Sequence, residues 1–271
     1  MLDEDLKKTA AKLRALALDA IYNGGSGHPG GSLSLAAIMS VLYFDEMNID
    51  PKDPKKEDRD RFVLSKGHAA PILYASLALK GFIPVEDLKT LRHSNSYLQG
   101  HPDMKHTSGV DMSTGSLGQG ISAACGMAKA GLMNKKDYRV YAVLGDGEIN
   151  EGQVWEALMF AHHYALHNLT VILDHNGLQI DGSNDEVMKL DNLKERFESF
   201  GFNTIEIDGN DIAAIKGALK SAREYTEGPT AIIANTVKGK GVDFMENQVG
   251  WHGKAPSAEE LSKALSQLEE K

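Results

Sequence analysis

Short runs rich in β-branched residues alternate with stretches of helical spacing along the second half of the 271-residue chain. Strands separated by helices of such length pair in parallel, and the helices cover both faces of the sheet. The pattern therefore predicts an α/β fold built on one parallel sheet. The expected strands are 61–64, 138–144, 169–174, 203–207 and 230–236, and the expected helices are 1–22, 33–46, 154–166, 190–200, 212–225 and 257–268.

Composition narrows the class of protein. Acidic residues outnumber basic ones by 38 to 29, and a net charge of -9 disfavours nucleic acid and membranes as main partners. The single cysteine, Cys125, excludes an intrachain disulfide and every cysteine-clustered metal site. No apolar stretch approaches the ~18 residues that a membrane span needs, and the amino end lacks the layout of a signal peptide. We therefore expect a cytoplasmic chain.

The most specific motif is Gly145-Asp146-Gly147, directly after an expected strand, with Asn176 just after the next strand. Both positions belong to the edge where open α/β sheets bind ligands. A carboxylate, an amide oxygen and a nearby main-chain carbonyl would suit magnesium, and the glycines let backbone approach a diphosphate. The alternative is a tight turn with Asp146 as an ordinary helix N-cap. Glu151 follows Asp146 closely in the sequence, and the segment 176–182 begins at Asn176. Both features favour the metal interpretation.

Four of the ten histidines have a glycine as a direct neighbour in turn-like contexts: His28, His68, His101 and His252. Imidazoles on glycine loops suit a cleft that meets sugar hydroxyls and phosphates. A plain turn role is the alternative for any one of them. A zinc site is disfavoured, because the chain has no His-Glu-x-x-His motif. We expect packing, surface or supporting roles for the others, His93, His106, His162, His163, His167 and His175.

Taken in order, these motifs resemble those of the transketolase family. Gly-Asp-Gly with its later Asn resembles the thiamine diphosphate signature. The segments Gly-His-Pro-Gly, Lys-Gly-His, Gly-His-Pro, Gly-Ser-Leu-Gly-Gln-Gly (115–120, opening a helix to about Met133) and a final His-Gly resemble transketolase itself. The resemblance covers about residues 8–253 and implies the thiamine diphosphate-binding fold, as a parallel sheet with helices on both faces.

The resemblance also implies a role for each matching position. Asp146, the side chain of Asn176 and the main-chain oxygen of Leu178 would bind Mg²⁺, with Ca²⁺ or Mn²⁺ as substitutes. Gly147, His68 and His252 would contact the diphosphate, Gly115 and Leu117 the aminopyrimidine ring, and Ile180 would pack on the cofactor. The catalytic positions would be His28, His101 and His252, around the first carbons of a donor ketose, and Glu151, against a glutamate of a partner subunit.

Members of this family move a two-carbon ketol unit from a ketose phosphate to an aldose phosphate, and the carbon chemistry belongs to the cofactor. Full-length members continue into a pyrimidine-binding domain and a C-terminal domain. We expect residues 1–271 to form a single diphosphate-binding domain that lacks both. The chain would then be the N-terminal subunit of a two-chain transketolase of the pentose phosphate pathway, in an α2β2 heterotetramer with a separate C-terminal subunit.

Three other interpretations remain open. One is a synthase similar to 1-deoxyxylulose-5-phosphate synthase, which condenses pyruvate with a triose phosphate, and another is a two-carbon transferase for an unusual sugar. The third is a non-catalytic protein that binds the cofactor and regulates, because fold alone does not guarantee activity. At the level of single residues, the sequence also allows Glu151 a local helix-capping role.

Overall fold

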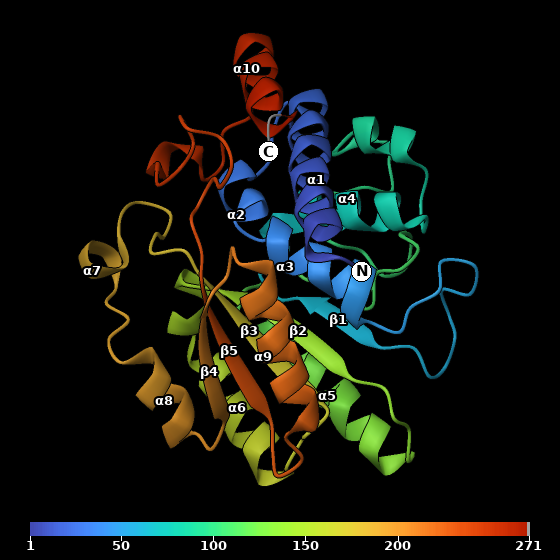
Figure 1. Ribbon diagram of the computed structural model, residues 1–271, viewed down its shortest axis with the longest axis vertical. Helices are drawn as coiled ribbons and strands as arrows, with labels where there is room; N and C mark the ends of the chain where they lie inside the picture. Colours follow the sequence, from blue (N-terminus) through green and yellow to red (C-terminus); the bar gives the residue numbers. More distant parts are fainter. Residues whose placement is uncertain (270–271) are drawn as a thin grey trace.

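Five parallel strands form the centre of the protein, a computed structural model that describes residues 1–269 (Figure 1). They are β1 (Arg61–Leu64), β2 (Val140–Gly145), β3 (Leu169–His175), β4 (Asn203–Asp208) and β5 (Thr230–Asn235). Every neighbouring pair is parallel, in the order β1-β2-β3-β5-β4. The five expected strands and the parallel sheet are therefore confirmed, each strand to within two residues at either end.

Helices cover both faces of the sheet because successive strand residues point to opposite sides. Phe62 and Tyr141 belong to the core of one face, under α1 (Asp3–Gly24), α3 (Ala36–Val41), α4 (Ala70–Lys80) and α9 (Ile212–Glu224). Val63 and Ala142 belong to the core of the other face, under α5 (Gln119–Met133), α6 (Gly152–His163) and α8 (Leu193–Ser199). In Figure 1, α9 crosses in front of the strands. The α/β fold class predicted from the sequence is thus confirmed.

A third apolar cluster joins the two ends of the chain. The final helix α10 (Ala258–Glu269) packs against α1 (Figure 1), and Leu18, Trp251 and Leu261 are among the residues buried between them. This contact holds the segment between β5 and α10 over the rest of the fold. His252 follows Trp251 directly, so the cluster also anchors a predicted site residue.

The single helix expected over 33–46 was wrong. The structure has α2 (Pro29–Leu33), α3 and a π-helical turn (Leu42–Glu46), with an interruption after Leu33. Ser34 lies at this interruption and donates a hydrogen bond to Asp174 Oδ2 at 2.7 Å. The break in the helix therefore places a buried hydroxyl at the end of β3.

The remaining helical turns lie in connections. They are 3-10 turns at Gly67–Ala69, Val85–Thr90, Gly147–Asn150 and Val249–Trp251, and the short helix α7 (Asn184–Val187). The sequence analysis missed α7, although Ser183 and Glu186 form a capping box at its start. α8 begins at Leu193 rather than 190, because Asn192 adopts a left-handed conformation with φ 51°. None of the described helices combines the length and apolar content needed to cross a bilayer.

Candidate functional site

A cavity of about 430 Å³ opens at the carboxyl edge of the sheet. Residues just beyond β1, β2, β3 and β5 line it, among them Lys66, Asp146, Asn176 and Lys238. This is the edge at which the sequence analysis placed the ligand. The predicted site residues that line the cavity are His28, His68, Gly115, Leu117, Asp146, Gly147, Glu151, Asn176, Leu178, Ile180 and His252.

His101 is the one predicted site residue that does not line the cavity. It is exposed and lies behind the cavity wall, where a Cβ added to Gly115 would come within 2.9 Å of its ring. Its main-chain oxygen accepts a hydrogen bond from the Tyr74 hydroxyl at 3.0 Å. The His101 ring is therefore adjacent to the cavity through Gly115, on a loop that Tyr74 holds in place.

Asp146 is buried, with 2% of its surface exposed. Its Oδ2 accepts hydrogen bonds from the Gly177 amide at 2.7 Å and from Asn184 Nδ2 at 3.0 Å. Its Oδ1 is buried without a partner. Asp146 makes no capping hydrogen bond to the 3-10 turn that follows it, so the N-cap interpretation was wrong. Burial raises the pKa of Asp146 to about 6. An unpartnered carboxylate oxygen in such a place fits a bound cation.

The other oxygens that a cation would need come from the loop after β3. The Asn176 amide is oriented, because Nδ2 donates to Asp174 Oδ2 at 3.3 Å and Oδ1 accepts from the Leu178 amide at 3.2 Å. Within residues 1–269, no three His, Cys, Asp or Glu side chains are grouped so that they could share a metal ion. A metal at Asp146 would therefore rely on amide and main-chain oxygens, which suits a hard cation such as Mg²⁺.

A buried ion pair forms the floor of the cavity. Asp174 is fully buried and accepts hydrogen bonds from Lys66 Nζ at 2.5 Å and Thr236 Oγ1 at 2.5 Å, besides the one from Ser34. Burial acts to raise the pKa of Asp174, but the Lys66 ammonium and the hydroxyl donors outweigh it and hold that pKa below its usual range. Lys66, 1% exposed, is held in place by this pair and lines the cavity.

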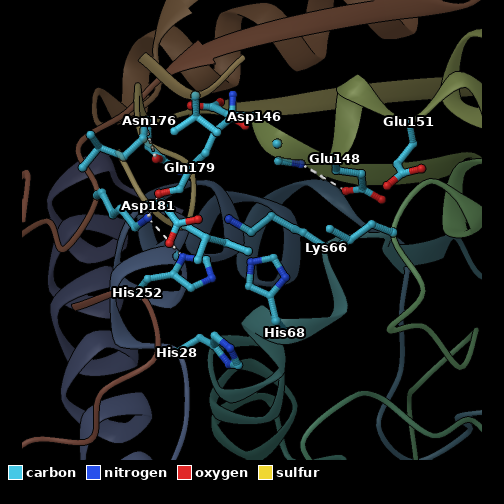
Figure 2. A pocket seen from close by; sticks show the side chains of 18 of the residues that line it. His28, Lys66, His68, Asp146, Glu148, Glu151, Asn176, Gln179, Asp181 and His252 are labelled. Carbon is cyan, nitrogen blue, oxygen red and sulfur yellow. Dashed lines mark hydrogen bonds between the residues drawn. The ribbon is translucent and has the colours of Figure 1, made fainter. Parts of the chain in front are cut away.

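Three histidine rings meet on the other side of the cavity from Asp146 and Asn176 (Figure 2). The ring centroids of His28, His68 and His252 lie 5.2 to 5.5 Å apart. Burial, with nearby cations, lowers the pKa of His28 and His252 to about 4 and that of His68 to about 2. All three rings are therefore neutral at pH 7. The Nδ1 atom of His28 is buried without a partner, so it is available to a ligand.

A second buried lysine, Lys238, follows β5. It is 2% exposed, and its Nζ lies 3.1 Å from His252 Nδ1 and 3.4 Å from the Gln179 main-chain oxygen. Burial, followed by the repulsion of Lys66, lowers the pKa of Lys238 to about 8. The sequence analysis did not assign Lys66 or Lys238 to the site. Each lies two or three residues beyond a strand end, so the rule that singled out Asp146 also points to them.

Glycines keep the cavity open between these charges. A Cβ at Gly31 would lie 3.3 Å from Lys66 Nζ, and a Cβ at Gly145 or Gly147 would meet its nearest atom at 3.5 or 3.6 Å. A side chain at Gly145 or Gly147 would therefore take up cavity space in ordinary contact with the protein, whereas one at Gly31 would also press on the Lys66 ammonium. The glycines and the two lysines form a cradle that fits a diphosphate.

Two glutamates lie near the start of α6. Glu148 is 1% exposed, and its carboxylate accepts hydrogen bonds from the Gly118 amide at 3.0 Å, the Gly145 amide at 3.1 Å and the Ser65 hydroxyl. Glu151 is exposed and occupies the N-cap position of α6, but its side chain makes no capping hydrogen bond. The capping role that the sequence allowed for Glu151 was therefore wrong. Its carboxylate lies at the cavity and is open to a partner.

Comparison with known proteins places this architecture in a family. Residues 6–269 match the family model described as transketolase, thiamine diphosphate binding domain. The chain is 44% identical over 265 residues to the 6-deoxy-6-sulfo-D-fructose transketolase subunit of Clostridium sp. strain MSTE9, covering 98% of this chain and 96% of that one. It is 40% identical over 268 residues to the apulose-4-phosphate transketolase subunit of Phocaeicola vulgatus, covering 99% and 95%.

Solved structures agree with the sequence relatives. The transketolase of Campylobacter jejuni superposes with a TM-score of 0.94 at 37% identity, and the match covers 99% of this chain but 43% of that one. The chain therefore corresponds in length to the separate subunits and to less than half of the longer transketolase. It belongs to the transketolase family, as a subunit of the N-terminal, thiamine diphosphate-binding type.

Proposed function

We propose that the chain binds thiamine diphosphate together with Mg²⁺, for which Ca²⁺ or Mn²⁺ can substitute, and acts as the N-terminal subunit of a transketolase. The enzyme would transfer a two-carbon ketol unit from a ketose phosphate to an aldose phosphate. The observation that carries the proposal is the make-up of one cavity. An unpartnered oxygen of Asp146, two buried lysines and three neutral histidines line the same 430 Å³ space.

Each end of the cavity suits one part of the cofactor. Lys66, Lys238, His68 and Gly147 would hold the diphosphate, and His252, beside Lys238, would contact it as well. Asp146, Asn176 and the main-chain oxygen of Leu178 would hold the metal. Gly115 and Leu117 would contact the aminopyrimidine ring, and Ile180, 62% exposed at the cavity, would gain apolar cover from the cofactor. When bound, the cofactor supplies a nucleophilic thiazolium carbon.

The histidines would handle the sugar. A neutral imidazole can donate one hydrogen bond and accept another, which matches a sugar hydroxyl. His28, His101 and His252 would position the hydroxyls of the donor ketose and move protons as its carbon chain is cleaved. Their low pKa values keep them able to accept a proton at neutral pH. The two relatives are named for sugars with a sulfonate or a phosphate, and we propose anionic sugars as substrates here too.

We further propose that residues 1–271 form a single diphosphate-binding domain and that a separate subunit supplies the pyrimidine-binding domain. Both relatives matched over nearly their whole length are named as subunits. Ile180 and Val187, 62% and 42% exposed at the cavity, and the exposed Glu151 offer a surface for that partner. We propose an α2β2 heterotetramer of the pentose phosphate pathway. The lone, buried Cys125 supports a cytoplasmic location.

Calorimetric titration of thiamine diphosphate with Mg²⁺ tests cofactor binding, and we expect the affinity to be greatest between about pH 6 and pH 8. Below the pKa of Asp146, about 6, protons compete with the metal for its carboxylate. Above the pKa of Lys238, about 8, the diphosphate loses a positive partner. Along the acid limb of this pH profile, below pH 6, and along its alkaline limb, above pH 8, binding should weaken by up to tenfold per pH unit.

Lys238→Met serves as the matched variant for this titration. It should bind the cofactor more weakly at every pH and lose the alkaline limb, while it keeps the acid limb set by Asp146. Absence of binding by the unaltered chain at any pH would contradict the proposed function. An alkaline limb that persists in Lys238→Met would show that another group is responsible.

His101→Ala and His252→Ala should lower kcat of the assembled enzyme by about 100-fold or more, because each removes a group placed to transfer protons or orient hydroxyls. The stability of the chain should change by less than about 1 kcal/mol, since neither ring belongs to an apolar cluster of the core. Steady-state kinetics and thermal unfolding measure the two effects. His106→Ala, whose ring is exposed and pairs with Asp103, is the control and should retain full turnover. Unaltered turnover in both site variants would show that these histidines have no catalytic role and only form turns.

A further inference from the structure

Lys238 is a buried lysine without a carboxylate partner. Its side chain is 2% exposed and lines the cavity. In the described part of the chain, no Asp or Glu oxygen lies within ion-pair distance of its Nζ, whereas Lys66, which is also buried, is paired with Asp174. The Lys238 Nζ instead contacts His252 Nδ1 at 3.1 Å and the Gln179 main-chain oxygen at 3.4 Å. Lys238 is therefore held in the cavity by uncharged groups.

These surroundings favour the uncharged amine of Lys238. Burial, followed by repulsion from Lys66, lowers its pKa to about 8, although Asp146 and Asp174 oppose the shift. At pH 7 about one-tenth of an amine with this pKa is deprotonated, roughly 200 times the fraction for an ordinary lysine. Only the deprotonated amine has a lone pair with which to attack a carbonyl carbon. Lys238 is therefore a better nucleophile near neutral pH than an exposed lysine.

The position of Lys66 determines which electrophile would reach Lys238. Gly30 and Gly31 are consecutive, and a Cβ at Gly30 would lie 3.0 Å from Lys238 Cε, while a Cβ at Gly31 would lie 3.3 Å from Lys66 Nζ. The two lysines thus flank one short stretch of backbone, and both line the cavity. Together with the glycines of the cradle they attract an anion. An anionic group bound at Lys66 brings the rest of a small molecule close to Lys238.

We propose that Lys238 is a covalent modification site, which forms an imine with a small phosphorylated aldehyde in chains that hold no cofactor. The phosphate of the aldehyde would occupy the cradle beside Lys66. The inference rests on the proposed function, in which aldose phosphates are substrates and thiamine diphosphate occupies the same cradle. The cofactor and the aldehyde then compete for one lysine, so loading of the cofactor slows as the concentration of phosphorylated aldehyde rises.

The bond changes require no oxidant or reductant. The lone pair of Lys238 Nζ attacks the carbonyl carbon, and the carbonyl oxygen takes up a proton to give a carbinolamine. The nitrogen then expels this hydroxyl as water and forms the C=N bond, so the amine loses two hydrogens and the aldehyde loses its oxygen. His252 Nδ1, 3.1 Å from Nζ, is placed to accept a proton from the attacking nitrogen and return it to the departing hydroxyl. Addition of water reverses the reaction and frees the lysine.

Reductive trapping on the whole chain, freed of cofactor and metal, tests the proposal. The chain is incubated with glyceraldehyde 3-phosphate at pH 7 and treated with sodium cyanoborohydride, which reduces the imine to a stable secondary amine. Peptide mass spectrometry then locates the label. Lys238 should carry at least about tenfold more label than Lys66 or any exposed lysine. Pyrophosphate, or thiamine diphosphate with Mg²⁺, should prevent this labelling, and the labelled chain should no longer bind the cofactor in a calorimetric titration.

Matched reagents and variants show what the label requires. Unphosphorylated glyceraldehyde should label Lys238 at least about tenfold less than glyceraldehyde 3-phosphate, because it lacks the anion that the cradle attracts. Lys238→Arg keeps the positive charge but presents no amine, so it should lose the label at this position. Lys220→Arg, on the exposed side of α9, is the control and should leave the labelling of Lys238 unchanged. The labelled position is read from the unaltered chain, so the result does not depend on the folding of a variant.

Four outcomes would overturn the inference. They are label spread evenly over the exposed lysines, label concentrated at Lys66, equal labelling by the two aldehydes, and labelling of Lys238 that pyrophosphate leaves unchanged. Protection by pyrophosphate but not by thiamine diphosphate would support the modification site and contradict the proposed function instead.

Discussion

Asp146→Ala is expected to abolish metal-dependent binding of thiamine diphosphate, weakening it by more than about 100-fold, while the chain stays folded. The carboxylate is the only charged ligand that we assign to the metal, and loss of a charged ligand from such a site costs several kcal/mol, so about 3 kcal/mol is a lower estimate. Calorimetric titration of the cofactor with Mg²⁺ measures the loss, and thermal unfolding reports on the fold. Unchanged affinity in the variant would exclude this metal site.

Asp146→Asn provides the matched control for stability. Asparagine can still accept the hydrogen bonds from Gly177 and Asn184, but it carries no charge. The folded pKa of about 6 lies above the ordinary value of 3.8, so the metal-free fold loses stability as the pH rises from about 4 to about 6. The loss amounts to at most about 3 kcal/mol. At pH 7 the metal-free Asn variant should therefore unfold at a higher temperature than the unaltered chain, although it no longer binds the metal.

The chain alone should show no ketol transfer, and a separate pyrimidine-binding subunit should raise the rate by at least about 1000-fold. Glu148, the buried glutamate at this cavity, has its carboxylate occupied by three donors, so it is poorly placed to activate the aminopyrimidine ring. Glu151 is free to meet a glutamate of the partner, and the exposed Ile180 would be covered on assembly.

Transfer from xylulose 5-phosphate to ribose 5-phosphate, assayed with this chain, with the partner and with both, measures the effect. Native mass spectrometry of the mixture should show two copies of each subunit. The Asp146→Ala chain mixed with the same partner should stay inactive, which would locate the activity in this cavity. Full turnover by the single chain would contradict the two-subunit proposal, and release of carbon dioxide from pyruvate would favour the synthase alternative.

The strands were the most predictable part of the fold, because short β-branched runs between helical stretches leave little choice of topology. The segment 33–46 shows where this reasoning failed. Its apolar residues have helical spacing throughout, and nothing local reveals that the helix is interrupted beside Ser34. At the interruption the Ser34 hydroxyl donates to the Gly31 main-chain oxygen and to Asp174, which lies 140 residues away in the sequence and is a partner that no local pattern reveals.

The residues that line the cavity were predictable where glycine accompanied a polar residue, as at Asp146, His28, His68 and His252, whereas His101 lies beside the cavity. Lys66 and Lys238 were missed because a lysine is ordinarily exposed, and its burial depends on partners distant in sequence. Lys66 is buried against Asp174, and Lys238 beside His252 and the main chain of Gln179. Asn184, which holds Asp146 in place, lies on α7, a helix of four residues that is too short to give a periodic signal.

The Lys66–Asp174 pair constrains how this sequence can change over evolutionary time. Both side chains are almost wholly inaccessible, with exposures of 1% and 0%. Removal of one member of a buried pair costs roughly 3–5 kcal/mol, a large part of the 5–15 kcal/mol by which a typical domain is stable. A lineage that replaced either residue alone would pass through a poorly folded intermediate. Lys66 and Asp174 are therefore expected to be inherited together or exchanged together, so that the cation beneath the diphosphate cradle is retained even where the surrounding loops diverge.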